Sequence, residues 1–160
     1  MDNEVLGRIT AISLFIINNK GEMLLHKKAD DHTPIRHQWA VPCFVHDDDT
    51  RTTQEIAHKH LRTYGLECNL YEVFSIAVSS PTHHGSGEHI IIALTTTPHH
   101  TTILNDLHRW AHINKILQET HDYPSRYVPW FRSALEGVVL YLKSYCKTDT
   151  TQQFSIQLEM

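Results

Sequence analysis

Cysteine is scarce in this sequence, and long apolar runs are missing from it. The three cysteines, Cys43, Cys68 and Cys146, have no paired spacing, which suits a reducing compartment better than a disulfide scaffold. No apolar stretch of about 18 residues occurs, so we expect no membrane-spanning helix. The first ten residues lack a basic segment followed by an apolar one, so we expect no secretory signal. Together these shortages predict a cytoplasmic protein.

Positive charge is also too scarce for a general nucleic-acid-binding protein. The formal net charge is −4, and the isoelectric point is about 6.4. The 160 residues are enough for one domain with a substantial core, and no internal repeat or linker divides them. We therefore predict a single domain over residues 1–147, followed by a polar tail over residues 148–160.

Histidine is the residue present in excess, at 14 of the 160 positions. It binds metals and titrates near neutral pH, so such an excess raises the question of a metal site. The histidines are scattered along the chain, however, and no H-E-x-x-H or C-x-x-C motif accompanies them. We therefore interpret the excess as a feature of composition, with most histidines in solvated loops and not in one metal site.

The first part of the chain predicts strands. Residues 9–17 are rich in β-branched side chains and indicate a buried strand. The turn sequence NNKGE follows, and residues 23–28 are expected to pair back as a hairpin. Residues 39–46 predict a short strand that Pro42 interrupts, which indicates a sheet edge or a bulge.

The second part mixes strands and helices. Residues 66–80 predict one long strand or two short ones, and residues 88–97 predict another. Residues 103–120 are interpreted as helical or mixed, with a strand-like stretch at 108–113. The order of elements predicts an α+β domain. A final helix over residues 130–146 has an apolar stripe formed by Phe131, Leu135, Val138, Val139 and Leu142.

The stretch TTQEIAHKHLRTYGLE, residues 52–67, predicts an amphipathic helix in the middle of the chain. Ala57, Leu61 and Tyr64 recur at helical spacing, and Gly65 stands where a helix stop is expected. The preceding residues 47–50, DDDT, are expected to cap its N-terminus. The polar face of this helix is basic and carries His58, Lys59 and Arg62.

This order of elements, with a helix followed by YGLE, resembles the Nudix fold, a mixed sheet between helices. The resemblance implies a box, G-x5-E-x7-R-E-U-x-E-E-x-G-U, where U is aliphatic. Its clustered glutamates hold Mg²⁺ or Mn²⁺ against a diphosphate. When Gly65 anchors the box, its last three glutamates fall on Lys59, Arg62 and Thr63. A cation at Arg62 repels a divalent metal, so we expect this helix not to build the usual metal site.

Three segments resemble one branch of that fold, the type I isopentenyl-diphosphate isomerases. GEMLLHKKADDH resembles the hairpin LLLQQRSDAK of that branch, and WAVPCFVH resembles its W/F-T-N-x-x-C-x-H segment. YVPWFRSALEGVVLYL resembles its TPWF segment and terminal helix, and GEHIII is similar to its GEHEID strand. These segments cover most of the chain from Arg8 to Tyr145. PWF before a terminal helix is the most specific of them.

The resemblance implies a catalytic cysteine and glutamate, which protonate and deprotonate the allylic carbons from opposite faces. Cys43 is near the cysteine, one residue out of register, and Glu88 falls on one of two strand glutamates. His46 falls on a histidine that binds the metal, so the predicted metal ligands are His46 and Glu88, with Mg²⁺ or Mn²⁺ as the ion if any is bound. Two ligands are fewer than the three or four that hold a divalent ion firmly.

The resemblance also implies contacts to an anionic ligand. Lys28 and Lys59 fall on basic positions that grip the diphosphate in the isomerases, and Trp130, with Trp39, falls on a residue that walls the pocket. Each candidate has an ordinary alternative: a buried strand thiol for Cys43, solvated charges for the lysines, and core packing for the tryptophans.

Three functions stay open from the sequence. The first is binding of a small anionic molecule such as a diphosphate, or of a partner, with little or no metal-dependent hydrolysis. The second is an enzyme, either a divergent Nudix hydrolase or an isomerase that uses Cys43 and Glu88. The third is a structural or interaction role. Nucleic acid and membrane are not expected as partners.

Overall fold

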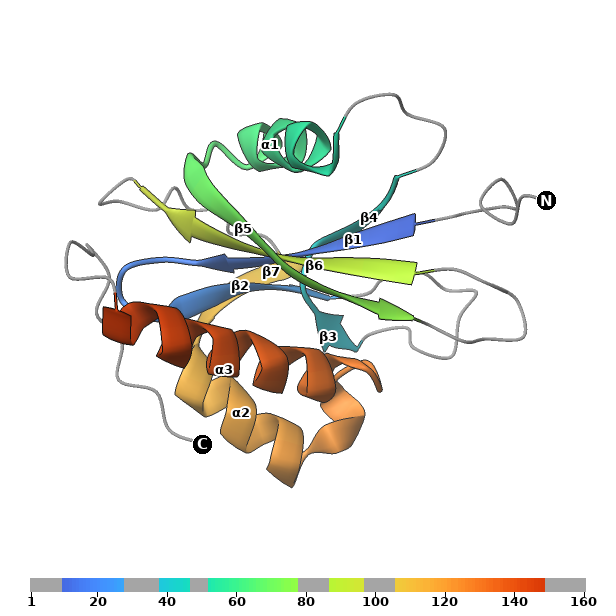
Figure 1. Cartoon of the computed structure of the whole chain (residues 1–160). Helices are drawn as coiled ribbons and strands as arrows, with labels where there is room; N and C mark the ends of the chain where they lie inside the picture. The colour runs from blue at the N-terminus through green and yellow to red at the C-terminus, as the bar shows by residue number, and fades with distance from the viewer. Residues whose placement is uncertain (1–9, 28–37, 47–51, 78–86, 97–105, 149–160) are drawn as a thin grey trace.

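The computed structural model describes residues 10–27, 38–46, 52–77, 87–96 and 106–148. In these segments one mixed sheet has one helix on one face and two on the other (Figure 1), which confirms the predicted α+β class. None of the described helices is long and apolar enough to cross a membrane. Residues 149–160, most of the predicted tail, lie outside the described residues, and the domain boundary at residue 147 stays a prediction.

Strand β1 organises the sheet, because it pairs with β2 and β4 in the antiparallel direction and with β6 in the parallel direction. β5 continues the sheet beyond β6, whereas β3 and β7 both pair with β2. The described strands are β1 (Thr10–Ile17), β2 (Glu22–Lys27), β3 (Trp39–Ala40), β4 (Cys43–His46), β5 (Cys68–Ala77), β6 (Gly87–Thr95) and β7 (His108–His112).

The turn between β1 and β2 is closed by the side chain of Asn18. Its Oδ1 accepts hydrogen bonds from the backbone N–H of Lys20, at 2.9 Å, and of Glu22, at 3.0 Å. Gly21 has a φ of 82°, a left-handed conformation that glycine adopts without steric cost. The predicted hairpin is therefore confirmed, since β1 and β2 pair in the antiparallel direction on either side of this turn.

The strand segment at residues 39–46 divides at Pro42, as its sequence predicts. β3, before the proline, pairs with β2, whereas β4, after it, pairs with β1. The carbonyl of Pro42 accepts a hydrogen bond from the N–H of Leu14 at 2.9 Å. Because proline has no N–H to give to a sheet, the chain changes its partner strand at this residue.

Helix α1 (Thr53–Thr63) confirms the predicted helix but corrects its N-terminal cap. The predicted cap at residues 47–50 is wrong, because Thr52 is the N-cap. Its Oγ1 accepts from the N–H of Glu55 at 3.1 Å, and Glu55 Oε1 accepts from the N–H of Thr52 at 2.8 Å. This capping box is encoded by the T-x-x-E spacing, a signal that was overlooked. Gly65, with φ 69°, follows the helix as predicted.

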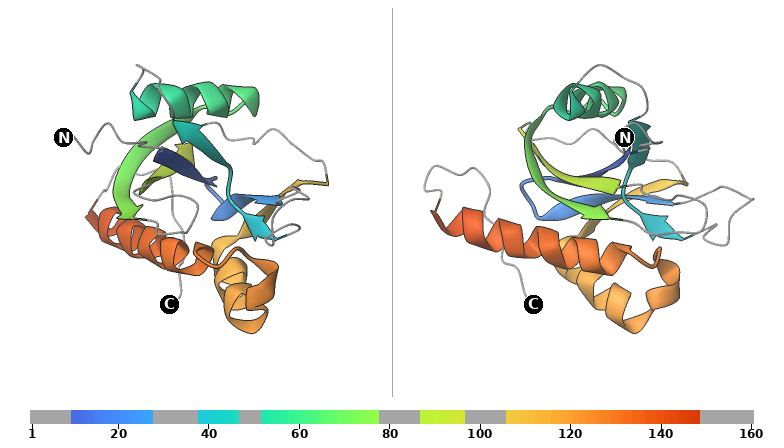
Figure 2. Two further views of the ribbon diagram at one scale, coloured as in Figure 1. Left: turned by 90° about the vertical axis from the view of Figure 1, so that its right-hand side faces the viewer. Right: turned by 45° about the vertical axis from the view of Figure 1, so that its right-hand side comes forward.

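Helices α2 (Ile113–Asp122) and α3 (Phe131–Thr148) lie on the sheet face opposite α1 (Figure 2). A short 3₁₀ helix (Pro124–Arg126) follows α2. The ring of Phe131 stacks on those of Phe15 and Tyr127, with centroids 6.0 and 5.4 Å apart. We call this side the α3 face. The apolar stripe predicted for α3 is buried here: Phe131, Leu135, Val138, Val139 and Leu142.

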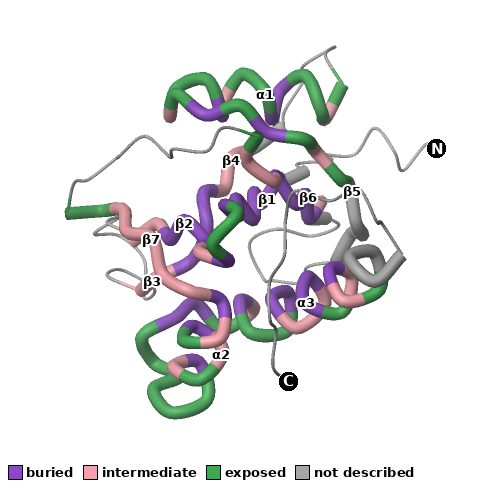
Figure 3. The backbone as a smooth tube through the Cα atoms, turned by 90° about the vertical axis from the view of Figure 1, so that its left-hand side faces the viewer, coloured by how far each residue is buried: buried purple, intermediate pink, exposed green. Residues whose placement is uncertain are grey.

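The other alternate residues of β1 point to the opposite side of the sheet, which we call the α1 face. Ile12, Leu14 and Ile16 are fully buried there, against Ile56 and Leu61 of α1. In Figure 3, buried backbone runs through β1 and along the sheet side of α1, whereas the outer side of α1 is exposed. The alternate side chains of β1 and the apolar side chains that recur along α1 therefore pack together in one small core.

Two segments that the sequence left ambiguous take definite forms. The region at residues 66–80 contains a single described strand, β5, with a register shift between Glu72 and Phe74. The region at residues 103–120 is mixed, because β7 is followed directly by α2. His112 ends the strand and caps the helix, since its Nδ1 accepts from the N–H of Asn114 at 3.1 Å.

Candidate functional site

The two residues predicted to be catalytic lie on the strands that flank β1. Cys43 of β4 pairs with Ser13, and Glu88 of β6 pairs with Ala11. Ser13 and Ala11 are two positions apart on β1, so positions 43 and 88 belong to rows on the same face of the sheet. Cys43 is half-buried. The topology therefore brings the predicted pair to one face, on either side of β1.

The two predicted metal ligands are out of phase with each other. His46 pairs with Thr10, whereas Glu88 pairs with Ala11, the next residue along β1. Neighbouring rows alternate between the faces of a sheet, so positions 46 and 88 belong to rows on opposite faces. In the part of the chain that the structure describes, no three His, Cys, Asp or Glu residues gather as metal ligands. The described residues therefore do not fit a divalent-metal site.

The polar face of α1 is exposed and basic, as predicted. His58, Lys59 and Arg62 are all exposed, and Thr63 beside them is exposed too. His60 differs from them, because it is half-buried and its ring stacks on Phe44 of β4 with centroids 3.7 Å apart. The helix thus presents the predicted cations to solvent. Lys28, the other predicted anion contact, lies outside the described residues.

Trp130 lies just before α3 and is half-buried. Its ring meets that of Phe131 edge-on, with centroids 6.3 Å apart, and it packs against the core of the α3 face. Trp39 packs against the same core from β3. Both tryptophans therefore have packing contacts, and their predicted place in the wall of a ligand pocket stays a prediction.

Two cations that the sequence interpretation missed surround Trp39. Lys27 pairs with Trp39 across β2 and β3, and its Nζ lies 5.8 Å from the centroid of the indole ring. Arg109 of β7 has its Cζ 4.6 Å from the same centroid. Both distances are within the range of a cation–π contact. The alternation of β7 was the available signal for Arg109, but residues 103–120 were left between helix and strand.

Arg109 also belongs to a polar network with α2. Its Nη2 lies 3.5 Å from Oε1 of Glu119, and the hydroxyl of Tyr127 donates to the same Oε1 at 2.6 Å. Burial first, and then this hydrogen bond to Glu119, raises the pKa of Tyr127 above its usual value. The phenol therefore stays protonated and acts as a donor that fixes the Glu119 carboxylate.

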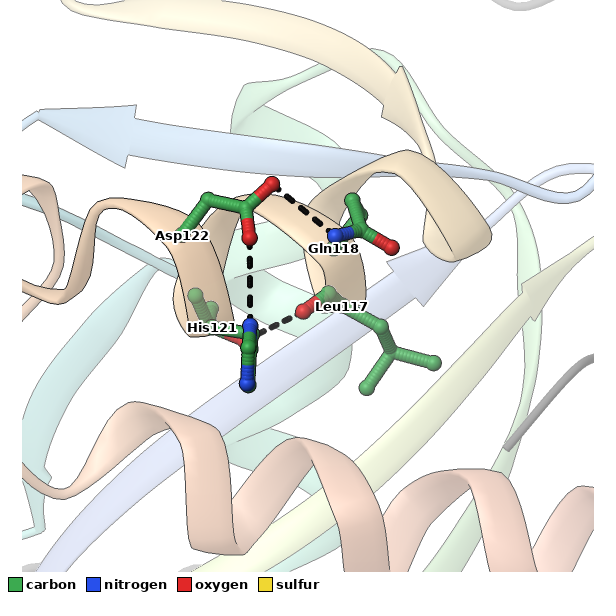
Figure 4. A network of polar contacts seen from close by, with 5 residues as sticks. Leu117, Gln118, His121 and Asp122 are labelled. Atoms are coloured by element: carbon green, nitrogen blue, oxygen red, sulfur yellow. Dashed lines mark hydrogen bonds and ion pairs between the residues drawn. The ribbon is translucent and has the colours of Figure 1, made fainter.

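The C-terminal end of α2 has a separate network on the surface (Figure 4). Gln118 Nε2 donates to Oδ2 of Asp122 at 2.9 Å, and Nδ1 of His121 lies 3.1 Å from Oδ1. The hydrogen bonds from Gln118 and then from His121 lower the pKa of Asp122. These contacts compensate a carboxylate at the negative end of a helix dipole, and they are interpreted as local helix stabilisation.

Histidines on the α1 face form another cluster. His26 of β2 pairs with His108 of β7, and their rings stack with centroids 4.8 Å apart. Tyr64, at the end of α1, meets His108 edge-on at 5.6 Å. Burial lowers the pKa of His108, because the charged imidazolium loses hydration there. The cluster joins the end of α1 to the edge of the sheet.

Comparison with known proteins bears on these assignments. No protein-family model matches the chain. A solved structure of a mutT/nudix family protein from Listeria innocua superposes with a TM-score of 0.68 at 10% sequence identity, covering 88% of this chain and 98% of that one. This chain has the Nudix fold.

The sequence is similar to isopentenyl-diphosphate isomerases. The protein from Halorhodospira halophila is 29% identical over 134 residues, which are 79% of this chain and 77% of the relative. The protein from Pectobacterium atrosepticum is 23% identical over 141 residues, which are 84% of this chain and 79% of the relative. Both the predicted Nudix resemblance and its closeness to this branch are therefore confirmed.

Proposed function

We propose that this Nudix-fold protein binds a small diphosphate-bearing ligand and catalyses little or no metal-dependent hydrolysis. One observation carries the proposal: the exposed face of α1 has Lys59 and Arg62 where the box has glutamates. Cations there repel Mg²⁺ or Mn²⁺ and favour an anion. The similarity to isopentenyl-diphosphate isomerases supports a diphosphate as the anion.

The contacts that hold α1 on the sheet support the proposal that this helix keeps its position while its exposed side chains bind an anion instead of a metal ion. The capping box at Thr52, the buried contacts of Leu61 and the left-handed Gly65 hold the helix firmly on the sheet. Its exposed charges are therefore presented by a rigid element. Lys28, Lys59 and Trp130 are the ligand contacts that the resemblance implies, and they form part of this proposal.

Calorimetry with isopentenyl diphosphate tests the proposal directly. Titrations with Mg²⁺ and with EDTA should give similar affinities, and phosphate release from nucleoside and isoprenoid diphosphates should stay at background. Lys59→Gln should weaken binding, whereas the matched control Lys115→Gln, on the exposed surface of α2, should not. Rapid hydrolysis that EDTA abolishes would refute the proposal.

A second candidate is isopentenyl-diphosphate isomerisation by Cys43 and Glu88. The register favours it, because positions 43 and 88 belong to one face on either side of β1. Two groups placed across a bound alkene are what protonation and deprotonation of its carbons require. Cys43→Ala and Glu88→Gln should then each abolish conversion of isopentenyl diphosphate. A wild-type protein without this activity, with or without Mg²⁺, rules the candidate out.

A further inference from the structure

Lys27, Trp39 and Arg109 form a cation–aromatic cluster at one edge of the sheet. Their strands lie side by side, because β2 pairs with both β3 and β7. Lys27 pairs with Trp39, and Arg109 pairs with Leu25, two residues before Lys27. Residues two apart on a strand face the same side, so both cations belong to the α3 face. Both lie over one indole ring, at 5.8 and 4.6 Å from its centroid.

The positive charge of this cluster is only partly compensated. Arg109 meets one carboxylate, Glu119, at 3.5 Å, which is longer than the 2.6 Å hydrogen bond from Tyr127 to the same oxygen. Arg109 Nε is buried and has no hydrogen-bond acceptor among the described residues. Within those residues no carboxylate pairs with Lys27, whose charge faces the indole. Among the described residues, two cations and the one carboxylate beside Arg109 leave an excess of positive charge.

The cluster is open to solvent on one side. The side chain of Arg109 is 41% exposed, and Lys27 and Trp39 are half-buried. The two ring distances keep Lys27 Nζ and Arg109 Cζ within about 10 Å of each other. A diphosphate carries more negative charge than a single phosphate and spans a greater length, so it is better suited to contact both cations at once. Guanidinium also binds phosphate oxygens through two parallel hydrogen bonds.

We infer that Lys27 and Arg109 bind the diphosphate group of the ligand beside the edge of Trp39. This inference rests on the proposed function and gives a diphosphate a second anion site, on the α3 face, apart from Lys59 and Arg62 of α1 on the opposite face. The same edge leads through β3 and Pro42 to Cys43, on the α3 face of the sheet. The diphosphate would thus bind near β4, the strand that carries Cys43.

Calorimetry on the full chain with inorganic pyrophosphate and orthophosphate, in EDTA, tests this assignment. The wild-type protein should prefer pyrophosphate. Lys27→Gln and Arg109→Gln should each weaken pyrophosphate binding about 10-fold or more and remove the preference. Lys115→Gln and Arg132→Gln, exposed on α2 and α3, are the matched controls and should bind as the wild type does. A merely structural role does not alter the ratio of the two affinities.

The outcomes separate this inference from the proposed function. If the wild type binds pyrophosphate and either variant retains the wild-type affinity and preference, the assignment to Lys27 and Arg109 is wrong and the proposed function stands. If the wild type binds neither pyrophosphate nor isopentenyl diphosphate, both fail. Lys27→Gln keeps the test valid if Arg109→Gln loosens α2, because its described side-chain contact is the Trp39 ring alone.

Discussion

The two faces of the sheet differ in what holds their helices. On the α3 face, an apolar core continues from β1 through Phe131 to the whole stripe of α3. On the α1 face, the core is smaller, and aromatic contacts with histidines surround it. Apolar burial is insensitive to pH, whereas imidazole contacts change when the ring gains a proton. The α3 face therefore has the larger apolar core, and the α1 face has the histidine ring contacts that protonation can change.

Phe131→Ala should have the largest effect on stability. The ring is fully buried and stacks on Phe15 and Tyr127, so its removal leaves a cavity that α3 cannot fill. We expect a loss of about 3–5 kcal/mol in the free energy of unfolding, measured by urea denaturation. Leu140→Ala in the same helix is the control. It is 58% exposed and should change stability by about 0.5 kcal/mol or less.

Leu61→Ala should have a smaller effect on the α1 face. Leu61 is 1% exposed, but the core around it is small, and α1 can settle towards the sheet. We expect a loss of about 2 kcal/mol, at the low end for buried leucines. Hydrogen exchange should also show α1 opening before α3. Arg62→Ala, the exposed neighbour, should leave both measurements unchanged, and a loss equal to that of Phe131→Ala would refute the ranking.

Thr52→Ala should remove the capping box of α1. Its hydroxyl oxygen accepts from the N–H of Glu55, which loses its partner in the variant. The expected loss is about 1 kcal/mol in urea denaturation. Thr52→Ser restores the oxygen and should recover most of this stability. Equal stability of the alanine and serine variants would show that the cap contributes nothing.

The smallest effect concerns His108 and pH. Burial lowers its pKa below the ordinary value of 6.5, so the folded protein binds fewer protons there than the unfolded chain. This contribution to stability is complete above pH 6.5 and is lost as the pH falls through the folded pKa. The urea midpoint should therefore drop less between pH 7 and pH 5 in His108→Phe than in the wild type. His58→Gln, exposed on α1, should drop as the wild type does.

Local patterns were sufficient to predict most elements of the fold. β-branched alternation predicted β1, the turn sequence predicted the hairpin, and helical spacing predicted α1 and α3. The cap of α1 was predicted at residues 47–50 because of the run DDDT that precedes the helix. The actual cap, Thr52, depends on a pair of reciprocal hydrogen bonds with Glu55, which a single-residue preference does not reveal.

The candidate site was less accessible from the sequence. Lys59 and Arg62 were predicted to be exposed, and they are, because an amphipathic helix fixes its polar face by spacing alone. Arg109 was missed because no turn sequence separates its strand from the following helix, so residues 103–120 were interpreted as helical or mixed. Arg109 contacts Trp39 only because β2 lies between β3 and β7, and no short sequence pattern predicts that strand order.

The sequence by itself determined the elements, the apolar stripes and the basic polar face of α1, since these follow from side-chain identity and spacing. Only the tertiary structure decided the strand registers. It brought positions 43 and 88 to one face, separated position 46 from them by one row, and gathered Lys27 and Arg109 on Trp39. The reason is physical: a register shift of one residue reverses the face of every side chain, and long-range packing selects that register.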